Sequence, residues 1–223
     1  MLFRRSHLTV ALLTFTAVSS AFGQLKNEKG ELISPVAFAN QGAITTSFVN
    51  SPSVGGSAGP GSGGGNTQWL KVEVHYGTTA ALTTKFIDSV QLKIWIEGLD
   101  LLATDAPVPG KGVAIALTGQ VTYVNIAAAR DVYGVFYVHP STLARYSSDR
   151  GFEDFDRKFD IHVEAYVNGT LMDAIDKNKE QDPKWFQALK VVPNLVYQQN
   201  QSPFLLADVD RYPAIKLPAN TGQ

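Results

Sequence analysis

The sequence predicts an all-β protein, an antiparallel sandwich with some short helix. Apolar and polar residues alternate in several short segments, which is typical of strands with one buried face. Turn-forming residues separate these segments at fairly regular intervals. The long intervening helices that a parallel sheet would need are not indicated. This spacing favours a β-sandwich of immunoglobulin-like type, with a small barrel as the alternative.

The expected strands can be followed along the chain. The first begins near Gln68, where every second residue is apolar. Later β-like segments lie at residues 90–97, 113–117, 120–126, 132–138, 159–167 and 170–176. The segments on either side of Gly119 are expected to form one bent strand. Residues 132–138 are apolar on both faces, which indicates a central strand.

Three shorter segments have distinct expectations. Residues 140–146 predict one or two helical turns. Asn168-Gly169 predicts a hairpin with a type I′ turn, because both residue types accept positive φ values. Residues 183–190 are either a helix, with Asp182 as its N-cap, or a last strand.

The first 23 residues are expected to be a cleavable secretory signal peptide. Arg4 and Arg5 precede an apolar run at residues 8–18, and small residues at a cleavage site end at Gly23. The run is too short for a membrane anchor, which needs about 20 residues. We therefore expect an exported protein, located in the periplasm, at the outer-membrane surface or outside the cell.

The rest of the chain is expected to have three parts. Residues 24–67 are an N-terminal arm and a glycine-rich linker, residues 68–212 the β-sandwich domain, and residues 213–223 a flexible tail. The linker, residues 51–66, holds seven glycines. The arm ends in an apolar patch at Phe48, and the sequence leaves open whether the arm docks on its own domain, on a neighbour or nowhere.

Composition excludes several classes of protein. The chain has no cysteine, so neither disulfides nor a lipoprotein anchor are expected. Without Arg4 and Arg5, the 19 basic residues become 17 against 20 acidic ones, a net charge of −3. This charge does not favour nucleic acid as a partner.

No catalytic residue, cofactor or metal site is expected. Ser57 lies in a nucleophile-elbow pattern, but in a glycine-rich linker without the required strand and helix. His75, His139 and His162 fall on separate strands or strand ends and are expected as isolated surface histidines, not zinc ligands. The acidic loop at residues 147–158 also contains cations, so we expect a solvated loop and not a calcium site.

Four aromatic residues form the candidate interaction surface. Trp69, Trp95 and Tyr166 lie on the polar phase of their strands, and Phe48 lies on the arm. If the strands that carry them are neighbours, Trp69, Trp95 and Tyr166 would form an exposed aromatic strip suited to binding sugars or a protein partner. The alternative, which we favour, is that loops partly cover them. Charged residues on this face would form cross-strand ion pairs, namely Lys71, Glu73, Lys93 and Glu97.

Several phrases resemble a known family. They are residues 69–74 (WLKVEV), 90–98 (VQLKIWIEG), 202–204 (SPF) and 210–212 (DRY). These phrases resemble small exported proteins encoded beside type IV pilus genes in mucin-dwelling verrucomicrobial bacteria, over residues 68–212. The resemblance implies an immunoglobulin-like fold and a role in pilus assembly or at the outer surface. It brings no catalytic residues, and the missing apolar helix after the leader implies an accessory protein instead of a pilin.

The expected function is therefore that of a non-enzymatic, exported structural or interaction protein. Its partners would be proteins of a pilus or outer-surface assembly, and an oligomer is compatible with this role. The arm and an exposed sheet edge would permit strand addition between neighbours. The alternative is a carbohydrate-binding module that uses the aromatic strip to hold glycans. A hydrolase ranks last.

Overall fold

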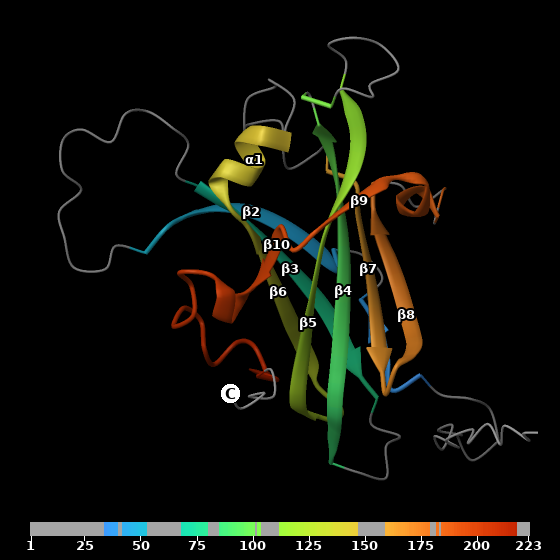
Figure 1. Ribbon diagram of the computed structural model, residues 1–223. Helices are drawn as coiled ribbons and strands as arrows, with labels where there is room; N and C mark the ends of the chain where they lie inside the picture. Colours follow the sequence, from blue (N-terminus) through green and yellow to red (C-terminus); the bar gives the residue numbers. More distant parts are fainter. Residues whose placement is uncertain are drawn as a thin grey trace, which may run out of the picture.

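The computed structural model describes residues 34–39, 42–52, 68–79, 85–100, 102–103, 112–146, 159–178, 182 and 184–217. Within these residues the strands form two sheets, which pack against each other (Figure 1). A short helix, α1 (Pro140–Tyr146), follows β6 and matches the predicted helical turns. The predicted all-β sandwich is confirmed.

The first sheet has five described strands. They are β1 (Val36–Phe38), β2 (Ile44–Asn50), β3 (Gln68–Thr78), β6 (Asp131–Val138) and β10 (Val196–Gln198). The order is β1-β3-β6-β10, and β2 pairs with β3 beside β1. The predicted central strand at residues 132–138 is β6, which lies between β3 and β10.

The N-terminal arm belongs to this sheet. β2 runs antiparallel to β3 over seven residue pairs, with Phe48 opposite Leu70, and β1 pairs with the other end of β3. The expected boundary at residue 68 is therefore wrong, and the arm docks on its own domain. The physical reason is the alternation within β2, which turns Ile44 and Phe48 toward the core. β2 can therefore pair with β3 and bury its apolar side chains at the edge of the sheet.

The second sheet has six described strands. They are β4 (Phe86–Asp100), β5 (Val113–Ala127), β7 (Ile161–Val167), β8 (Thr170–Lys177), β9 (Lys190–Pro193) and β11 (Ala214–Ile215). The order is β11-β5-β4-β7-β8, and β9 also pairs with β5. The β5–β9 pair is parallel, which corrects the expectation of a purely antiparallel sandwich. β11 pairs with β5, so the expectation of a flexible tail from residue 213 is wrong for Ala214 and Ile215.

The core lies between the inner faces of the two sheets. The apolar phases of β3 and β4 are at most 1% exposed, and they comprise Leu70, Val72, Val74, Tyr76, Val90, Leu92, Ile94 and Ile96. Full burial of one such aliphatic side chain stabilises the fold by about 1.5–3 kcal/mol. Tyr123 of β5 also points inward, and its hydroxyl accepts a hydrogen bond from the Val135 amide at 2.8 Å. The bond satisfies a buried donor of β6.

The predicted turns and bends are largely as expected. Asn168 and Gly169 have φ values of 51° and 77°, as a type I′ turn requires, and join β7 to β8. The segments on either side of Gly119 form the single strand β5. Residues 185–193 combine both alternatives, because a 3₁₀ helix, η2 (Trp185–Ala188), precedes β9. Asp182 accepts backbone hydrogen bonds there, but the residue at the N-cap is Lys184.

Some expectations concern other parts of the chain. The signal peptide at residues 1–23, Ser57 and the charged loop at residues 147–158 lie outside the described residues. No helix in the described part has the length and apolar character needed to cross a membrane.

Candidate interaction site on the first sheet

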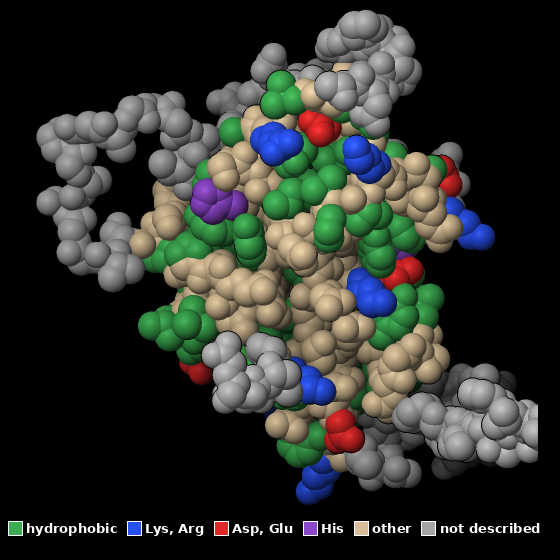
Figure 2. Space-filling view, viewed as in Figure 1, with side chains coloured by type: hydrophobic (Ala, Val, Ile, Leu, Met, Phe, Trp, Pro, Cys, Tyr) green, Lys and Arg blue, Asp and Glu red, His purple; other side chains and the backbone are tan. Residues whose placement is uncertain are grey.

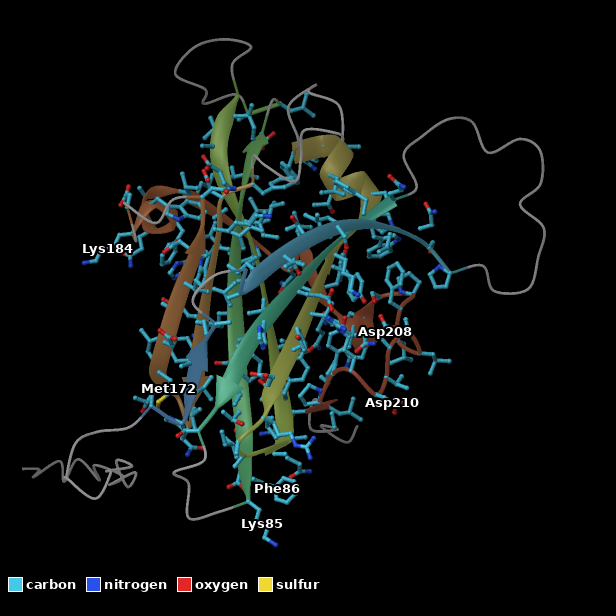
Figure 3. The ribbon with its side chains drawn as sticks, turned by 180° about the vertical axis from the view of Figure 1, so that it is seen from behind. Lys85, Phe86, Met172, Lys184, Asp208 and Asp210 are labelled. Carbon is cyan, nitrogen blue, oxygen red and sulfur yellow. The ribbon has the colours of Figure 1, made fainter. Side chains whose placement is uncertain are left out.

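The outer face of β3 and β6 is covered by a C-terminal segment. We call residues 202–212 the strap, because this turn-rich segment runs over the sheet between η3 (Gln199–Gln201) and β11. Figure 3 shows its residues Asp208 and Asp210 on the side of the molecule away from Met172 and Lys184. The strap meets the side chains that alternate with the core residues of β3, at Lys71 and Glu73.

Aromatic stacking anchors one end of the strap. The ring of Phe204 lies parallel to that of Tyr137 on β6, with centroids 4.5 Å apart. Trp69 meets Phe204 edge-on at 5.7 Å and also contacts the rings of His139 and Tyr197. Each aromatic pair of this kind contributes about 0.5–1.5 kcal/mol beyond the burial of its surface. Trp69 is therefore only 8% exposed and belongs to the anchor of the strap.

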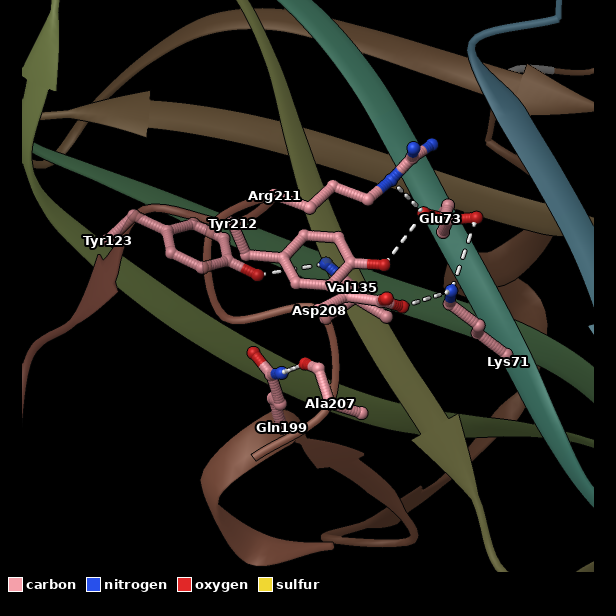
Figure 4. Close-up of polar contacts among 9 residues, drawn as sticks. All are labelled: Lys71, Glu73, Tyr123, Val135, Gln199, Ala207, Asp208, Arg211 and Tyr212. Atoms are coloured by element: carbon pink, nitrogen blue, oxygen red, sulfur yellow. Dashed lines mark hydrogen bonds and ion pairs between the residues drawn. The ribbon is translucent and has the colours of Figure 1, made fainter. Parts of the chain in front are cut away.

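A buried carboxamide holds the backbone of the strap. Gln199, which is 5% exposed, donates hydrogen bonds from Nε2 to the carbonyl oxygens of Phe204 and Ala207. The second of these bonds is drawn in Figure 4. The Ser202 hydroxyl donates to the Gln199 carbonyl at 2.8 Å, which fixes where the strap leaves η3. Together these bonds satisfy polar groups that the aromatic anchor removes from water.

Glu73 fastens the other end of the strap (Figure 4). Its Oε1 accepts hydrogen bonds from the Tyr212 hydroxyl at 2.7 Å and from Arg211 Nε at 2.8 Å. Lys71 Nζ lies 3.5 Å from Glu73 Oε2 and 3.5 Å from Asp208 Oδ2, so it links sheet and strap. The guanidinium of Arg211 also covers the Tyr133 ring at 4.3 Å. Lys93 and Glu97 belong to the second sheet, so the expectation that they pair with Lys71 and Glu73 across neighbouring strands is wrong.

The surroundings of Glu73 favour its charged form. Burial alone would raise the pKa of this carboxyl, but the hydrogen bond from Tyr212 and the charges of Lys71 and Arg211 outweigh it. The pKa of Glu73 therefore lies below its usual value of 4.5. Burial, followed by the hydrogen bond to Glu73, raises the pKa of Tyr212, so this phenol stays protonated and keeps donating.

The outer surface of the strap is apolar. Leu206 is 84% exposed, Val209 is 56% exposed and Leu205 is 53% exposed. Three aliphatic side chains thus point to solvent within five residues, on a segment fastened at both ends. We call Leu205, Leu206 and Val209 the strap patch. Scattered exposed leucines are ordinary, but clustered ones on a fixed support are a feature of binding surfaces.

The outer face of the second sheet carries a different cluster. His162 Nδ1 lies 2.9 Å from Asp176 Oδ1, and Trp185 Nε1 donates to the same oxygen at 2.9 Å. Phe186 stacks on the His162 ring at 3.9 Å, and Trp95 packs against Phe186 at 4.8 Å. These contacts hold η2 on the sheet and leave His162 only 3% exposed. The expectation of surface histidines is therefore wrong for His162, because η2 covers it.

Tyr166, the other candidate aromatic residue on this face, makes contacts with two charged side chains. Lys93 Nζ lies 4.3 Å above the ring of Tyr166, whose hydroxyl donates to Glu164 at 2.5 Å. Burial and the bond to Glu164 raise the pKa of Tyr166 to about 12. The described part of the chain holds no group of three or more metal-ligating side chains that could bind an ion.

The candidate aromatic residues are not brought together in one strip. Trp95 and Tyr166 lie on one face of the second sheet, whereas Trp69 lies in the first sheet under the strap. Phe48 is half-buried on β2 and packs against the core. Sequence reasoning missed the strap patch, since this segment has no periodic pattern. The adjacent leucines at 205 and 206, in a stretch without strand alternation, were the available signal.

The fold and the strap define a class of protein, a two-sheet β-sandwich whose outer faces carry packed segments. The chain belongs to the family whose model matches residues 39–219. This span includes β2 and the whole strap, so both are parts of the family domain.

Comparison with solved structures supports the same fold. A crystal structure of a protein from Akkermansia muciniphila, a verrucomicrobium, superposes with a TM-score of 0.62 at 21% identity. The alignment covers 82% of this chain and 93% of that one. At this identity the likeness shows the fold alone. No curated protein matches the sequence.

Proposed function

We propose that this chain is a non-enzymatic, exported interaction protein that works in an outer-surface assembly linked to type IV pili. The strap patch is the observation that carries the proposal. It presents three exposed aliphatic side chains on a support whose position the protein itself fixes. The resemblance of residues 69–74, 90–98, 202–204 and 210–212 to pilus-linked proteins supports this assignment.

A preformed apolar surface is well suited to binding a protein. Ordering a flexible loop on binding costs about 0.5–1.5 kcal/mol for each immobilised side chain. Here Glu73 and the Phe204–Tyr137 stack hold the strap before any partner arrives. Burial of Leu205 and Leu206 by a partner would then not be offset by the cost of ordering the strap.

The non-enzymatic assignment rests on how the polar groups are used. Glu73 is shared by Tyr212, Arg211 and Lys71, and Asp176 is shared by His162 and Trp185. Each of these carboxylates bonds groups from a covering segment to a sheet. Such arrangements hold structure in place, which supports a structural use of both carboxylates.

The test is loss of a specific partner. The double variant Leu205→Ser/Leu206→Ser removes the centre of the strap patch, and Leu171→Ser, at a 49% exposed leucine of β8, is the matched control. Tagged proteins are cross-linked in the cells that make them and recovered from membranes. We expect the wild type and the control to recover a pilus or outer-membrane protein. The double variant should recover at least about tenfold less of it, as for loss of interface hot spots.

Stability has to be equal for the comparison to hold. Exposed substitutions change the free energy of unfolding by about 0.5 kcal/mol or less, so thermal melts of the three proteins should nearly coincide. Equal recovery by the wild type and the double variant would contradict a role for the strap patch. Failure of the wild type to recover any pilus or outer-membrane protein would contradict the proposed assembly.

A further inference from the structure

A polar groove lies where β10 crosses β5. It has a volume of about 640 Å³, and its described lining comes from β5, from β10 and its flanking residues, and from the segment that begins with β11. Its polar side chains are Gln120, Thr122, Asn194, Gln198, Gln201 and Lys216. β5 and β10 face the viewer in Figure 1, and in the same view Figure 2 shows that uncharged polar side chains and backbone dominate the middle of this face.

The close approach of two strands shapes one end of the groove. A Cβ atom on Gly119 would lie 2.2 Å from the Val196 carbonyl oxygen, so only glycine lets β10 pass this close to β5. Asn194 precedes this crossing in the left-handed conformation, with φ of 63°. The groove is thus bounded by backbone that is fixed by packing.

Two glutamines of the groove are oriented in advance. The side chain of Gln198 accepts a hydrogen bond from the Gln201 amide, and Gln201 Oε1 accepts one from the Gln198 amide at 3.3 Å. Because both carboxamide oxygens are engaged with backbone donors, both NH₂ groups remain to donate. These two side chains therefore present hydrogen-bond donors at little cost in conformational entropy.

The charge of the groove, like its hydrogen-bond donors, favours a ligand with acceptor or anionic groups. Lys216 adds a positive charge, and the described residues that line the groove include no carboxylate. Within the described part of the chain, Lys216, Gln120 and Asn194 form no side-chain hydrogen bond or ion pair. Hydrogen-bond donors and carboxamides beside a single cation match a ligand with many hydroxyls and a negative group.

We propose that this groove binds an acidic saccharide, a sugar chain that carries a carboxylate or a sulfate. Lys216 pairs with the anionic group, and the donors of Gln198 and Gln201 bond the acceptor oxygens of the sugar. This site is separate from the strap patch and does not depend on the proposed function. It gives glycan binding a location that the aromatic residues Trp69, Trp95 and Tyr166 do not provide.

The first test uses NMR titration of the full protein with three probes. They are trigalacturonic acid, the uncharged maltotriose, and sodium sulfate at matched ionic strength. We expect shifts of the groove amides with trigalacturonic acid, at an affinity well above that for maltotriose. Equal shifts with sulfate alone would identify a simple anion site, and absence of shifts in the groove with the acidic sugar would overturn the proposal.

Two matched lysine variants test whether the charge of Lys216 contributes to binding. Lys216→Gln should weaken binding of trigalacturonic acid about two- to fivefold, as expected for one exposed ion pair. Lys184→Gln removes an exposed lysine at the edge of the molecule that is not among the residues lining the groove, and it should leave binding unchanged (Figure 3). Equal affinities for the two variants would overturn the role of Lys216.

A further variant removes one carboxamide of the groove, that of Asn194, without disturbing the backbone. Asn194→Gly keeps the left-handed conformation, because glycine adopts positive φ freely. We expect it to weaken saccharide binding about twofold or more while the melting temperature stays near that of the wild type. Unchanged binding in Asn194→Gly would exclude this side chain from the site.

Discussion

Glu73 is the point at which the strap can be released with least disturbance to the core. Its side chain lies on the outer face of β3 and is 19% exposed, so replacing it creates no large cavity. We expect Glu73→Ala to lower stability by freeing the Tyr212 hydroxyl and the Arg211 guanidinium. Tyr212→Phe removes one hydroxyl from the same contact and leaves the ring in place.

The magnitude follows from the two hydrogen bonds. A hydrogen bond to a charged group contributes about 1.5–3 kcal/mol, which applies to the Tyr212 bond at 2.7 Å. Arg211 is half-exposed, so its ion pair adds only about 0.5 kcal/mol. The total for Glu73→Ala is about 2–3 kcal/mol. For a domain of this size that corresponds to a fall in melting temperature of roughly 4–12 °C.

A double-mutant cycle isolates the contact. Chemical unfolding of the wild type, Glu73→Ala, Tyr212→Phe and the double variant gives the coupling free energy, which we expect to be at least about 1 kcal/mol. The Trp69 ring, which contacts Phe204 of the strap, provides a fluorescence signal for the same transition. Losses that add to within about 0.3 kcal/mol would refute the bond as a fastening.

The same contact makes stability depend on pH. The pKa of Glu73 is lower in the folded protein than its usual value of 4.5, so the unfolded chain binds the proton more readily. The stabilisation is therefore complete above about pH 4.5 and is lost as the pH falls through the folded pKa. Glu73→Gln, which cannot titrate, should flatten this part of the pH profile. An unchanged slope would contradict the assigned pKa direction.

Three further predictions concern the sandwich itself. Gly119→Ala places a Cβ atom 2.2 Å from the Val196 carbonyl and should cost roughly 3 kcal/mol or prevent folding. Gly77→Ala, whose Cβ atom would lie 3.9 Å from its nearest neighbour, is the control for a thermal melt, and equal losses would contradict the close approach. Tyr123→Phe leaves a buried β6 amide without its acceptor and should cost about 1–3 kcal/mol. Tyr76→Phe removes a buried hydroxyl that has no hydrogen-bond partner among the described residues and should be near neutral by chemical denaturation, whereas a larger loss than for Tyr123→Phe would contradict this assignment.

Local pattern was sufficient for most of the strands. The alternation of β3 assigned Leu70 and Val72 to the core, and the Asn168-Gly169 pair located the β7–β8 hairpin, because both signals lie within a few residues. The position of β2 was not predictable in this way. Its partner β3 lies beyond the glycine-rich linker, and closing a longer loop costs little extra free energy. Pairing across a linker therefore leaves no local trace in the sequence.

The side chains of β3 that point away from the core show a second limit of prediction from sequence. Alternation predicts which side chains leave the core, but not whether another segment covers them. Trp69 and Glu73 leave the core and then meet the strap, whose sequence has no periodicity. The phrases SPF and DRY within residues 202–212 contain Phe204 and Tyr212, the two anchors, although the sequence did not reveal what they contact.

The segment from β10 through η3 joins the two surfaces proposed for this protein. Gln199 turns inward and holds the strap backbone, while its neighbours Gln198 and Gln201 line the groove. Substitution of Glu73 would release the end of the strap at Arg211 and Tyr212 but leave the Gln199 hydrogen bonds and the Phe204 stack intact. The groove should therefore keep its shape when the strap is loosened at Glu73. For this reason the partner-binding and saccharide-binding proposals can be tested independently in the same protein.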